Sequence, residues 1–128
     1  MSQKLGFEDL EVWKDSLDLA GKVLAAIQPV PIYDRLAQQI TGSVSSIAQN
    51  IAEGSGRYSR KEHLHFLYIA RGSLFETITL LEILRLRASI SDENFDDLRR
   101  RALLVSRKLN GYIAYIKRLK ELNARRPR

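Results

Sequence analysis

The sequence predicts an all-helical protein folded as an up-down-up-down antiparallel four-helix bundle. Four segments place apolar residues three and four positions apart, the period of a helix with one buried face, and no segment alternates as a strand does. Short connections separate the segments, and short connections favour antiparallel neighbours. With 128 residues, the chain is expected to form one domain, residues 1–128.

The first helix is expected over residues 7–28. Its apolar stripe comprises Leu10, Trp13, Leu17, Ala20, Leu24 and Ile27. Glu8 and Asp9 lie in its first turn, where the helix dipole favours negative charge. Pro29 and Pro31 follow it, and proline lacks the N–H group that a helix interior needs.

The second helix is expected over residues 34–53, with Asp34 as its N-cap. Small residues lie between its larger apolar positions and allow a neighbouring helix to come close; they are Ala37, Gly42, Ser43, Ser46 and Ala48. Gly54-Ser55-Gly56 is expected to end this helix by supplying left-handed backbone conformations.

The third helix, residues 60–88, is expected to open with a capping box formed by Ser59 and Glu62. The fourth, residues 92–122, follows Ser91 and keeps three–four spacing over eight apolar positions from Phe95 to Leu119. A polar, basic tail is expected over residues 123–128.

Two helices carry more apolar surface than a single bundle is expected to bury. Beside the stripe of the first helix lie Val12, Leu19, Val23 and Ala26, and the third helix has Phe66, Ile69, Leu80 and Ile83 in addition to its own stripe. Such extra apolar surface predicts self-association.

Composition narrows the functional classes. There is no cysteine, which excludes disulfides and thiolate metal sites and fits a cytoplasmic protein. No apolar run reaches the roughly 20 residues that span a bilayer, and the N-terminus lacks the pattern of a signal peptide. We therefore expect a soluble protein without a membrane partner.

Positive charge is concentrated at the C-terminal end. Residues 99–128 contain 11 basic residues and one acid, Glu121, whereas residues 1–98 contain 10 basic and 14 acidic residues. The fourth helix also has no acid between Arg99 and Lys120 to pair with these cations at i, i+4 spacing. Such asymmetry predicts an acidic partner.

We therefore predict a nucleic-acid-binding face on the fourth helix and its tail, with outward cations that hold phosphates and one tyrosine that stacks a base. The predicted residues are Arg99, Arg100, Arg101, Arg107, Lys108, Tyr115, Lys117, Arg118, Lys120, Arg125 and Arg126.

Catalytic and cofactor signatures are weak. Glu62 and His65 have the Glu-x-x-His spacing of bundle metal sites, but such a site needs a second pair on another helix, and the only other histidine is His63 nearby. Gly54-Ser55-Gly56-Arg57 lacks the Lys-Ser/Thr of a phosphate-binding loop. We expect no metal, no cofactor and no enzymatic activity.

Four polar residues interrupt apolar stretches of the second and third helices: Asn50, Glu53, Arg71 and Glu76. Carboxylates in such positions can serve acid–base chemistry, but polar residues there more often pair and fix register. We expect the structural role.

Several motifs resemble one family. They are residues 7–13 (FEDLEVW), 36–40 (LAQQI), 46–54 (SIAQNIAEG) and 69–76 (IARGSLFE), and the resemblance extends over roughly residues 7–119. The chain is similar to four-helix-bundle proteins first known from open reading frames inside intervening sequences of bacterial 23S rRNA genes. It departs from them at Ala48, where a proline is common.

The resemblance implies an up-down-up-down bundle assembled as a homopentameric ring. It also implies kinship with the accessory variability proteins of diversity-generating retroelements, which are basic pentamers that bind nucleic acid and a reverse transcriptase. The basic fourth helix is a feature of this chain and is not taken from the family motifs.

The leading functional hypothesis is a non-enzymatic, oligomeric accessory protein that binds structured RNA or RNA–DNA hybrids with low sequence specificity. A reverse transcriptase is a possible protein partner under this hypothesis. The alternative is a protein-interaction scaffold whose basic face docks an acidic partner protein.

Overall fold

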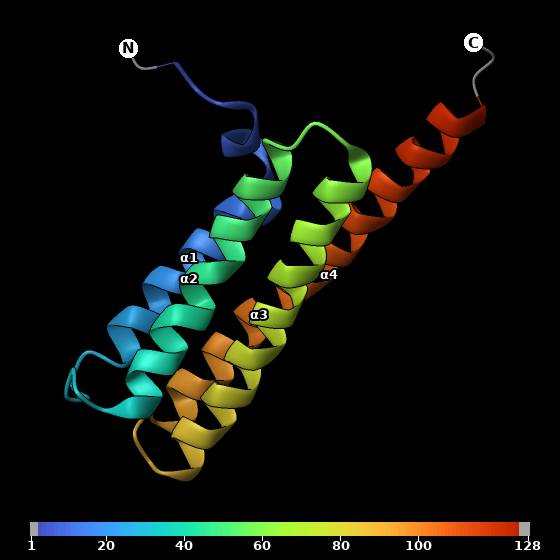
Figure 1. The fold of residues 1–128 in the computed structure, drawn as a ribbon. Coiled ribbons are helices and arrows are strands. Elements are labelled where there is room, and N and C mark those ends of the chain that lie inside the picture. Colours follow the sequence, from blue (N-terminus) through green and yellow to red (C-terminus); the bar gives the residue numbers. More distant parts are fainter. Residues whose placement is uncertain (1–2, 126–128) are drawn as a thin grey trace.

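The computed structural model describes residues 3–125, with side chains described as far as Leu119. A short 3-10 helix, η1 (Gly6–Asp9), precedes four α-helices: α1 (Glu11–Ala26), α2 (Arg35–Ser55), α3 (Arg60–Leu86) and α4 (Asp92–Arg125). Successive helices run in opposite directions, so that η1 and the end of α4 lie at the same end of the bundle (Figure 1). Residues 3–125 contain no strand, in agreement with the predicted all-helical class.

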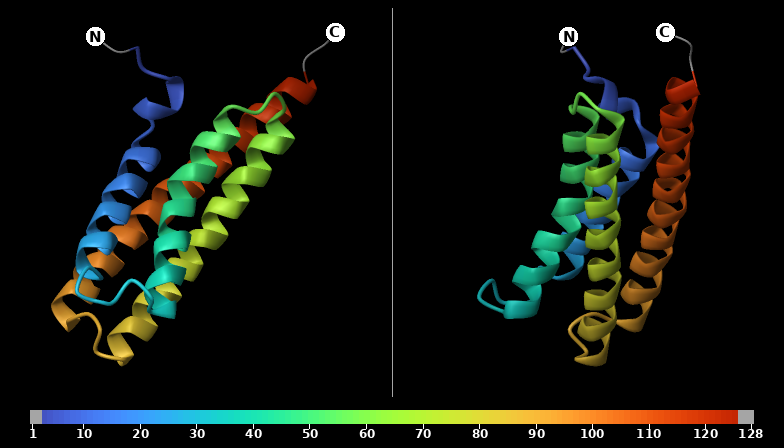
Figure 2. Two further views of the ribbon diagram at one scale, coloured as in Figure 1. Left: turned by 60° about the vertical axis from the view of Figure 1, so that its left-hand side comes forward. Right: turned by 45° about the vertical axis from the view of Figure 1, so that its right-hand side comes forward.

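The helices form a four-cornered bundle in which α1 packs against α2 and α4, and α3 packs against the same two neighbours (Figure 2). α4 is the longest helix. It continues three residues beyond the predicted end at 122, so the expected tail over 123–128 is wrong for 123–125. Arg126 lies outside the described residues.

Side-chain caps begin α2, α3 and α4, whereas α1 follows Leu10 without a side-chain cap. The Asp34 carboxylate accepts a hydrogen bond from the Ala37 N–H at 3.0 Å, and the Ser59 hydroxyl accepts one from the Glu62 N–H at 3.1 Å. Ser91 accepts one from the Asn94 N–H at 3.1 Å before α4. These caps satisfy N–H groups that the first turn of a helix leaves without an acceptor.

The predicted core stripe of α1 is correct at Ile27, and Leu10, Trp13 and Ala20 pack against the core, but it is wrong at Leu17 and Leu24. Leu17 and Leu24 are 46% and 42% exposed, whereas Val12 and Leu19 are buried in the core. The buried stripe continues through Val23 and Ile27. The predicted surplus apolar residues Val12, Leu19 and Val23 are therefore core residues of α1, whereas Leu17 and Leu24 lie on its exposed side.

Small residues bring α2 and α3 together, as the sequence predicts. The Ser43 and Thr77 hydroxyls lie 2.9 Å apart inside the bundle, and those of Ser46 and Ser73 lie 2.8 Å apart. Each pair satisfies both hydroxyls, which removes the cost of burying them unpaired. Two side-chain hydrogen bonds therefore join α2 and α3.

α3 comes close to α2 at Gly54. α2 ends at Ser55 with Gly56 as its C-cap, within the predicted Gly54-Ser55-Gly56 segment, and Gly54 itself lies in the last turn of the helix. The predicted left-handed backbone conformation is wrong, because no glycine of residues 3–125 has a positive φ. A Cβ atom at Gly54 would lie 3.0 Å from Phe66 Cβ and 3.1 Å from the His63 carbonyl oxygen. The glycine is needed here for space rather than for backbone conformation.

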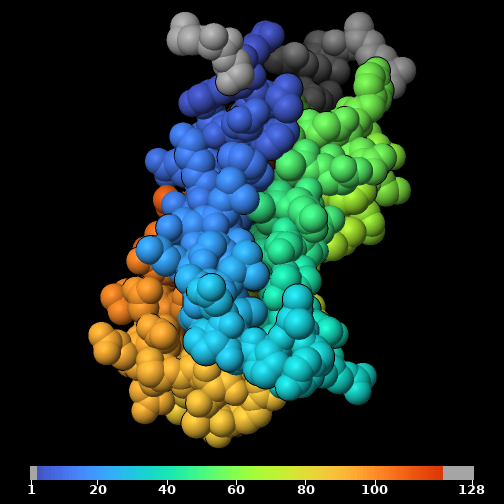
Figure 3. Space-filling view, turned by 90° about the vertical axis from the view of Figure 1, so that its left-hand side faces the viewer, coloured from blue at the N-terminus to red at the C-terminus, as the bar shows by residue number. Residues whose placement is uncertain are grey.

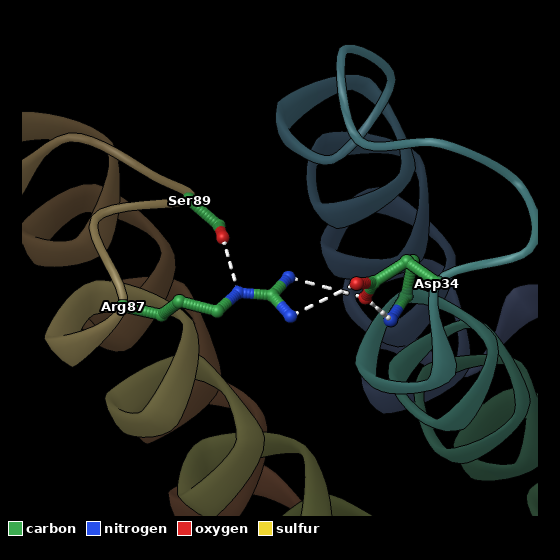
Figure 4. A network of polar contacts seen from close by, with 4 residues as sticks. Asp34, Arg87 and Ser89 are labelled. Atoms are coloured by element: carbon green, nitrogen blue, oxygen red, sulfur yellow. Dashed lines mark hydrogen bonds and ion pairs between the residues drawn. The ribbon is translucent and has the colours of Figure 1, made fainter.

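The opposite end of the bundle is tied by Arg87, just after α3. Its guanidinium donates to both carboxylate oxygens of Asp34 at 2.9 and 3.1 Å, and to the Ser89 hydroxyl at 2.7 Å (Figure 4). This ion pair lowers the pKa of Asp34, which also caps α2. The chain turns there through Ala88, which has a φ of 62°, while the Ser89 N–H donates to the Leu84 carbonyl oxygen.

None of the helices within residues 3–125 is long and apolar enough to cross a membrane.

Candidate nucleic-acid interface

The outer side of α4 carries arginines that point away from the core. Helical spacing places Arg100, Arg107 and Arg118 within about 20° of one direction, opposite the buried stripe from Phe95 to Ile116. All three side chains are exposed, and no ion pair among the described residues involves them. We call these three residues the outer arginine column.

Two of the predicted phosphate ligands face α1 instead. Arg101 pairs with Asp18 of α1 at 2.6 Å and with Asp97 of its own helix at 3.0 Å. Lys108 pairs with Asp15 at 2.6 Å and Glu11 at 3.2 Å. The predicted outward position of Arg101 and Lys108 is therefore wrong.

These carboxylates change the protonation equilibria of both cations. Hydrogen bonds to Asp97 and then Asp18 raise the pKa of Arg101, and those to Asp15 and Glu11 raise the pKa of Lys108. Both side chains stay charged at neutral pH, but most of their field is compensated by acids within a few ångströms. They join α1 to α4 and attract phosphates less than uncompensated cations do.

The other predicted residues with described side chains lie outside the outer arginine column. Arg99 is exposed, Tyr115 is exposed and stacks on Tyr112 with ring centroids 6.3 Å apart, and Lys117 lies over the Tyr68 ring of α3. Lys120 and Arg125 belong to α4, but their side chains are not among those described. The structure thus brings together only part of the predicted site.

The polar residues within the apolar stretches of α2 and α3 make local contacts. Asn50 donates to the Ser46 carbonyl and hydroxyl oxygens at 2.8 Å, and Glu53 pairs with Arg57 at 2.5 Å. Arg71 donates to Asn110 of α4 at 3.1 Å, whereas Glu76 is exposed. Asn50, Glu53, Phe7, Arg57 and Phe66 also line an open pocket of about 790 Å³ beside the end of α2.

Histidines do not mark a metal centre in the described part of the chain. Residues with described side chains include no group of three or more His, Asp or Glu side chains placed to hold an ion. His65 is exposed and packs edge-on against Phe66, with ring centroids 5.5 Å apart.

His63 is the buried titratable group that the sequence did not indicate. It lies under Gly54, with its Nε2 atom 3.4 Å from the Tyr112 hydroxyl of α4. Desolvation, with a smaller effect of Arg60, lowers the pKa of His63 from its ordinary value of 6.5, and burial raises the pKa of Tyr112. The lowered pKa of His63 favours the neutral imidazole at this contact between α2, α3 and α4.

We expect His63 to make stability depend on pH. Because its folded-state pKa is lowered, the unfolded chain binds a proton first as pH falls below about 6.5, and the free energy of unfolding decreases until pH reaches the folded-state pKa. Denaturant titrations between about pH 7.5 and pH 5 should show this decrease. His63→Gln should flatten the pH dependence of the free energy of unfolding, whereas His65→Gln should not change it. If the pH dependence is the same in His63→Gln as in wild type, groups other than His63 cause the decrease.

Comparison with known proteins identifies a family and related solved structures. The sequence model of the 23S rRNA-intervening sequence protein family matches residues 8–111. A crystal structure of a protein of unknown function from the S23 ribosomal protein family of Bacteroides thetaiotaomicron VPI-5482 is similar in fold, with a TM-score of 0.74 and 25% sequence identity. The similarity covers 80% of this chain and 97% of that one. No curated protein matches the chain.

Proposed function

This chain belongs to the 23S rRNA-intervening sequence protein family, and we propose that it acts by binding RNA through the outer side of α4, without catalysing a reaction. The observation that carries the proposal is the outer arginine column. Arg100, Arg107 and Arg118 are exposed and have no ion-pair partner among the described residues, while Arg101 and Lys108 of the same helix are paired with acids. The family model ends at residue 111, so it includes only part of this column.

The spacing of the column suits a phosphate backbone better than a single small anion. At 1.5 Å rise per residue, Arg100 and Arg107 are about 10 Å apart along the helix axis, and Arg118 is about 16 Å further on. Small side chains at Gly111 and Ala114 separate the last two arginines. Cations at these separations can each meet a different phosphate, which supplies affinity without reading sequence.

The finer parts of the proposal rest on the family resemblance. We propose structured RNA or RNA–DNA hybrids as targets, since phosphate contacts of this kind follow shape rather than sequence. The partner protein in this proposal is a reverse transcriptase that works on such hybrids. The retroelement kinship and the homopentameric ring belong to the same proposal.

Self-association is supported by apolar side chains that the bundle leaves exposed. On the face formed by α1 and α2 (Figure 3), Leu24 lines a groove with Ala37 and Thr41 of α2. Leu17, about two helical turns before Leu24 on the same side of α1, is exposed as well. On α3, Ile69 and Ile83 are 38% and 39% exposed. Since these are different surfaces, contacts between them would be head-to-tail and would close into a ring if the rotation allows.

We expect light scattering at micromolar concentration to report a multiple of the 14.7 kDa chain, five by resemblance. Leu17→Glu with Leu24→Glu should shift the mass towards the monomer while helicity is kept, because both side chains lie outside the core. Lys14→Glu, on an exposed part of α1, is the matched control. A wild-type monomer over the whole concentration range would exclude the ring.

The direct test of the proposed function is binding to a structured RNA and to an RNA–DNA hybrid at several salt concentrations. Each phosphate that the protein neutralises contributes about −0.7 to −0.9 to the slope of log affinity against log salt. We expect a steep slope and similar affinities for unrelated sequences. Absence of RNA binding, together with capture of an acidic protein partner, would favour the scaffold alternative.

A further inference from the structure

A second cationic site lies on the other side of α4, where this helix meets α3. Tyr68 of α3 is 38% exposed, the Cζ atom of Arg71 lies 5.2 Å from the centre of its ring, and the Nζ atom of Lys117 lies 5.5 Å from that centre. Asn110 of α4 accepts a hydrogen bond from Arg71 at 3.1 Å. We call Tyr68, Arg71, Asn110 and Lys117 the Tyr68 site.

Both cations of this site lie over an aromatic ring, and no acid among the described side chains pairs with them. Neither Arg71 nor Lys117 forms an ion pair with any of the described side chains. The bond to Asn110 uses one N–H group of the Arg71 guanidinium, which has five, so donors remain for an anion. The site thus keeps its positive charge while its side chains are already positioned, and positioned side chains lose less entropy on binding.

An aromatic surface continues from the site along α3. Phe75 is 52% exposed and lies seven residues after Tyr68, almost two helical turns further on the same side of α3. Exposed rings beside cations are the features that single-stranded nucleic acids use, since bases stack on rings and phosphates pair with the cations. In a duplex the base faces are stacked on one another, so they are not available to pack against the rings.

We propose that the Tyr68 site binds an unpaired nucleotide of RNA. The base packs against the exposed part of the Tyr68 ring, and Arg71 and Lys117 pair with phosphate oxygens. The inference rests on the proposed RNA binding and adds a preference: the outer arginine column holds any phosphate backbone, whereas the Tyr68 site favours loops, bulges and single strands over duplex.

The test compares the binding of a short oligouridylate RNA and of an RNA duplex of equal length by fluorescence anisotropy. Tyr68→Ala should weaken oligouridylate binding about 5- to 150-fold, the effect of losing one stacked base, and should leave duplex binding unchanged. Tyr68→Phe keeps the ring and should bind like the wild type. Arg71→Gln should weaken oligouridylate binding and reduce its salt slope by about 0.7.

The outcomes separate this inference from the proposed function. If wild type binds both RNAs and Tyr68→Ala binds them as tightly, the Tyr68 site is not a base-binding site, while RNA binding through α4 stands. If wild type binds neither RNA, both proposals are overturned. If Tyr68→Ala changes the mass of the oligomer by light scattering with helicity kept, this surface is a contact between copies, which also overturns the inference.

Discussion

Gly54→Ala is expected to destabilise the bundle by about 1–3 kcal/mol, the usual cost of adding a methyl group to a packed core. The new Cβ atom would lie 3.0 Å from Phe66 Cβ and from His63 Cδ2, and 3.1 Å from the His63 carbonyl oxygen. Two of these three atoms belong to the backbone or first side-chain carbon of α3, so relief requires the helices to separate. Denaturant unfolding followed by circular dichroism would measure the change.

Gly42→Ala is the matched control, because Gly42 lies in the same helix and a Cβ atom there would meet nothing within 4 Å. In an open helical position, alanine is more stable than glycine by roughly 0.5–1 kcal/mol. The two substitutions should therefore change stability in opposite directions. Equal effects of both would show that α2 and α3 have room at Gly54, and the close approach would then not explain that glycine.

Local features of the fold were predictable from the sequence because they depend on neighbours along the chain. Caps at Asp34 and Ser59 and the stop at Pro29 each act within a few residues, and the structure places helix boundaries close to them. The long apolar spacing of α4 also identified its buried side, since a single stripe leaves no second choice. Existence, order and type of the helices follow from such signals.

The orientation of α1 was not predictable in the same way. Its sequence has two apolar stripes, one through Leu17 and Leu24 and one through Val12 and Leu19, and both have helical spacing. Which stripe is buried depends on where α2 and α4 lie, and that is a property of the assembled bundle. Ser16, fully buried beside the second stripe with its hydroxyl bonded to the Val12 carbonyl oxygen, gave no signal of its position.

The same limit explains the error at the candidate site. The sequence has no acid on the fourth helix between Arg99 and Lys120, but the partners of Lys108 are Glu11 and Asp15, almost a hundred residues earlier in the chain. The spacing of the acids on α1 indicates these partners only once it is known which side of α1 faces α4. Likewise, the contact between Tyr68 and Lys117 joins two helices and has no local pattern.

The structure changes which cations of α4 should matter for RNA. Replacing the outer arginine column (Arg100→Gln, Arg107→Gln and Arg118→Gln) should weaken binding to every RNA tested. If each arginine meets one phosphate, the slope of log affinity against log salt should become shallower by about 2 to 3. Helicity and oligomer mass should be kept, because all three side chains are exposed.

Two control variants make this result specific. Lys14→Gln, Lys22→Gln and Arg35→Gln together remove the same charge from exposed positions of α1 and α2, and should leave the slope close to wild type if position rather than net charge governs binding. Arg101→Gln with Lys108→Gln should lower the unfolding midpoint, because four acids at the α1–α4 contact lose their partners, but should change the slope little.

The salt titrations of all four proteins on one structured RNA therefore decide between two views of α4. A shallower slope for the outer arginine column alone would identify its outer side as the phosphate-binding surface. A shallower slope for Arg101→Gln with Lys108→Gln, equal to that of the column, would mean that these two side chains leave their acids to bind RNA. If the column variant binds like wild type while folded, the outer side of α4 does not bind RNA, because the loss of three arginines from a phosphate-binding surface must reduce the number of counterions released.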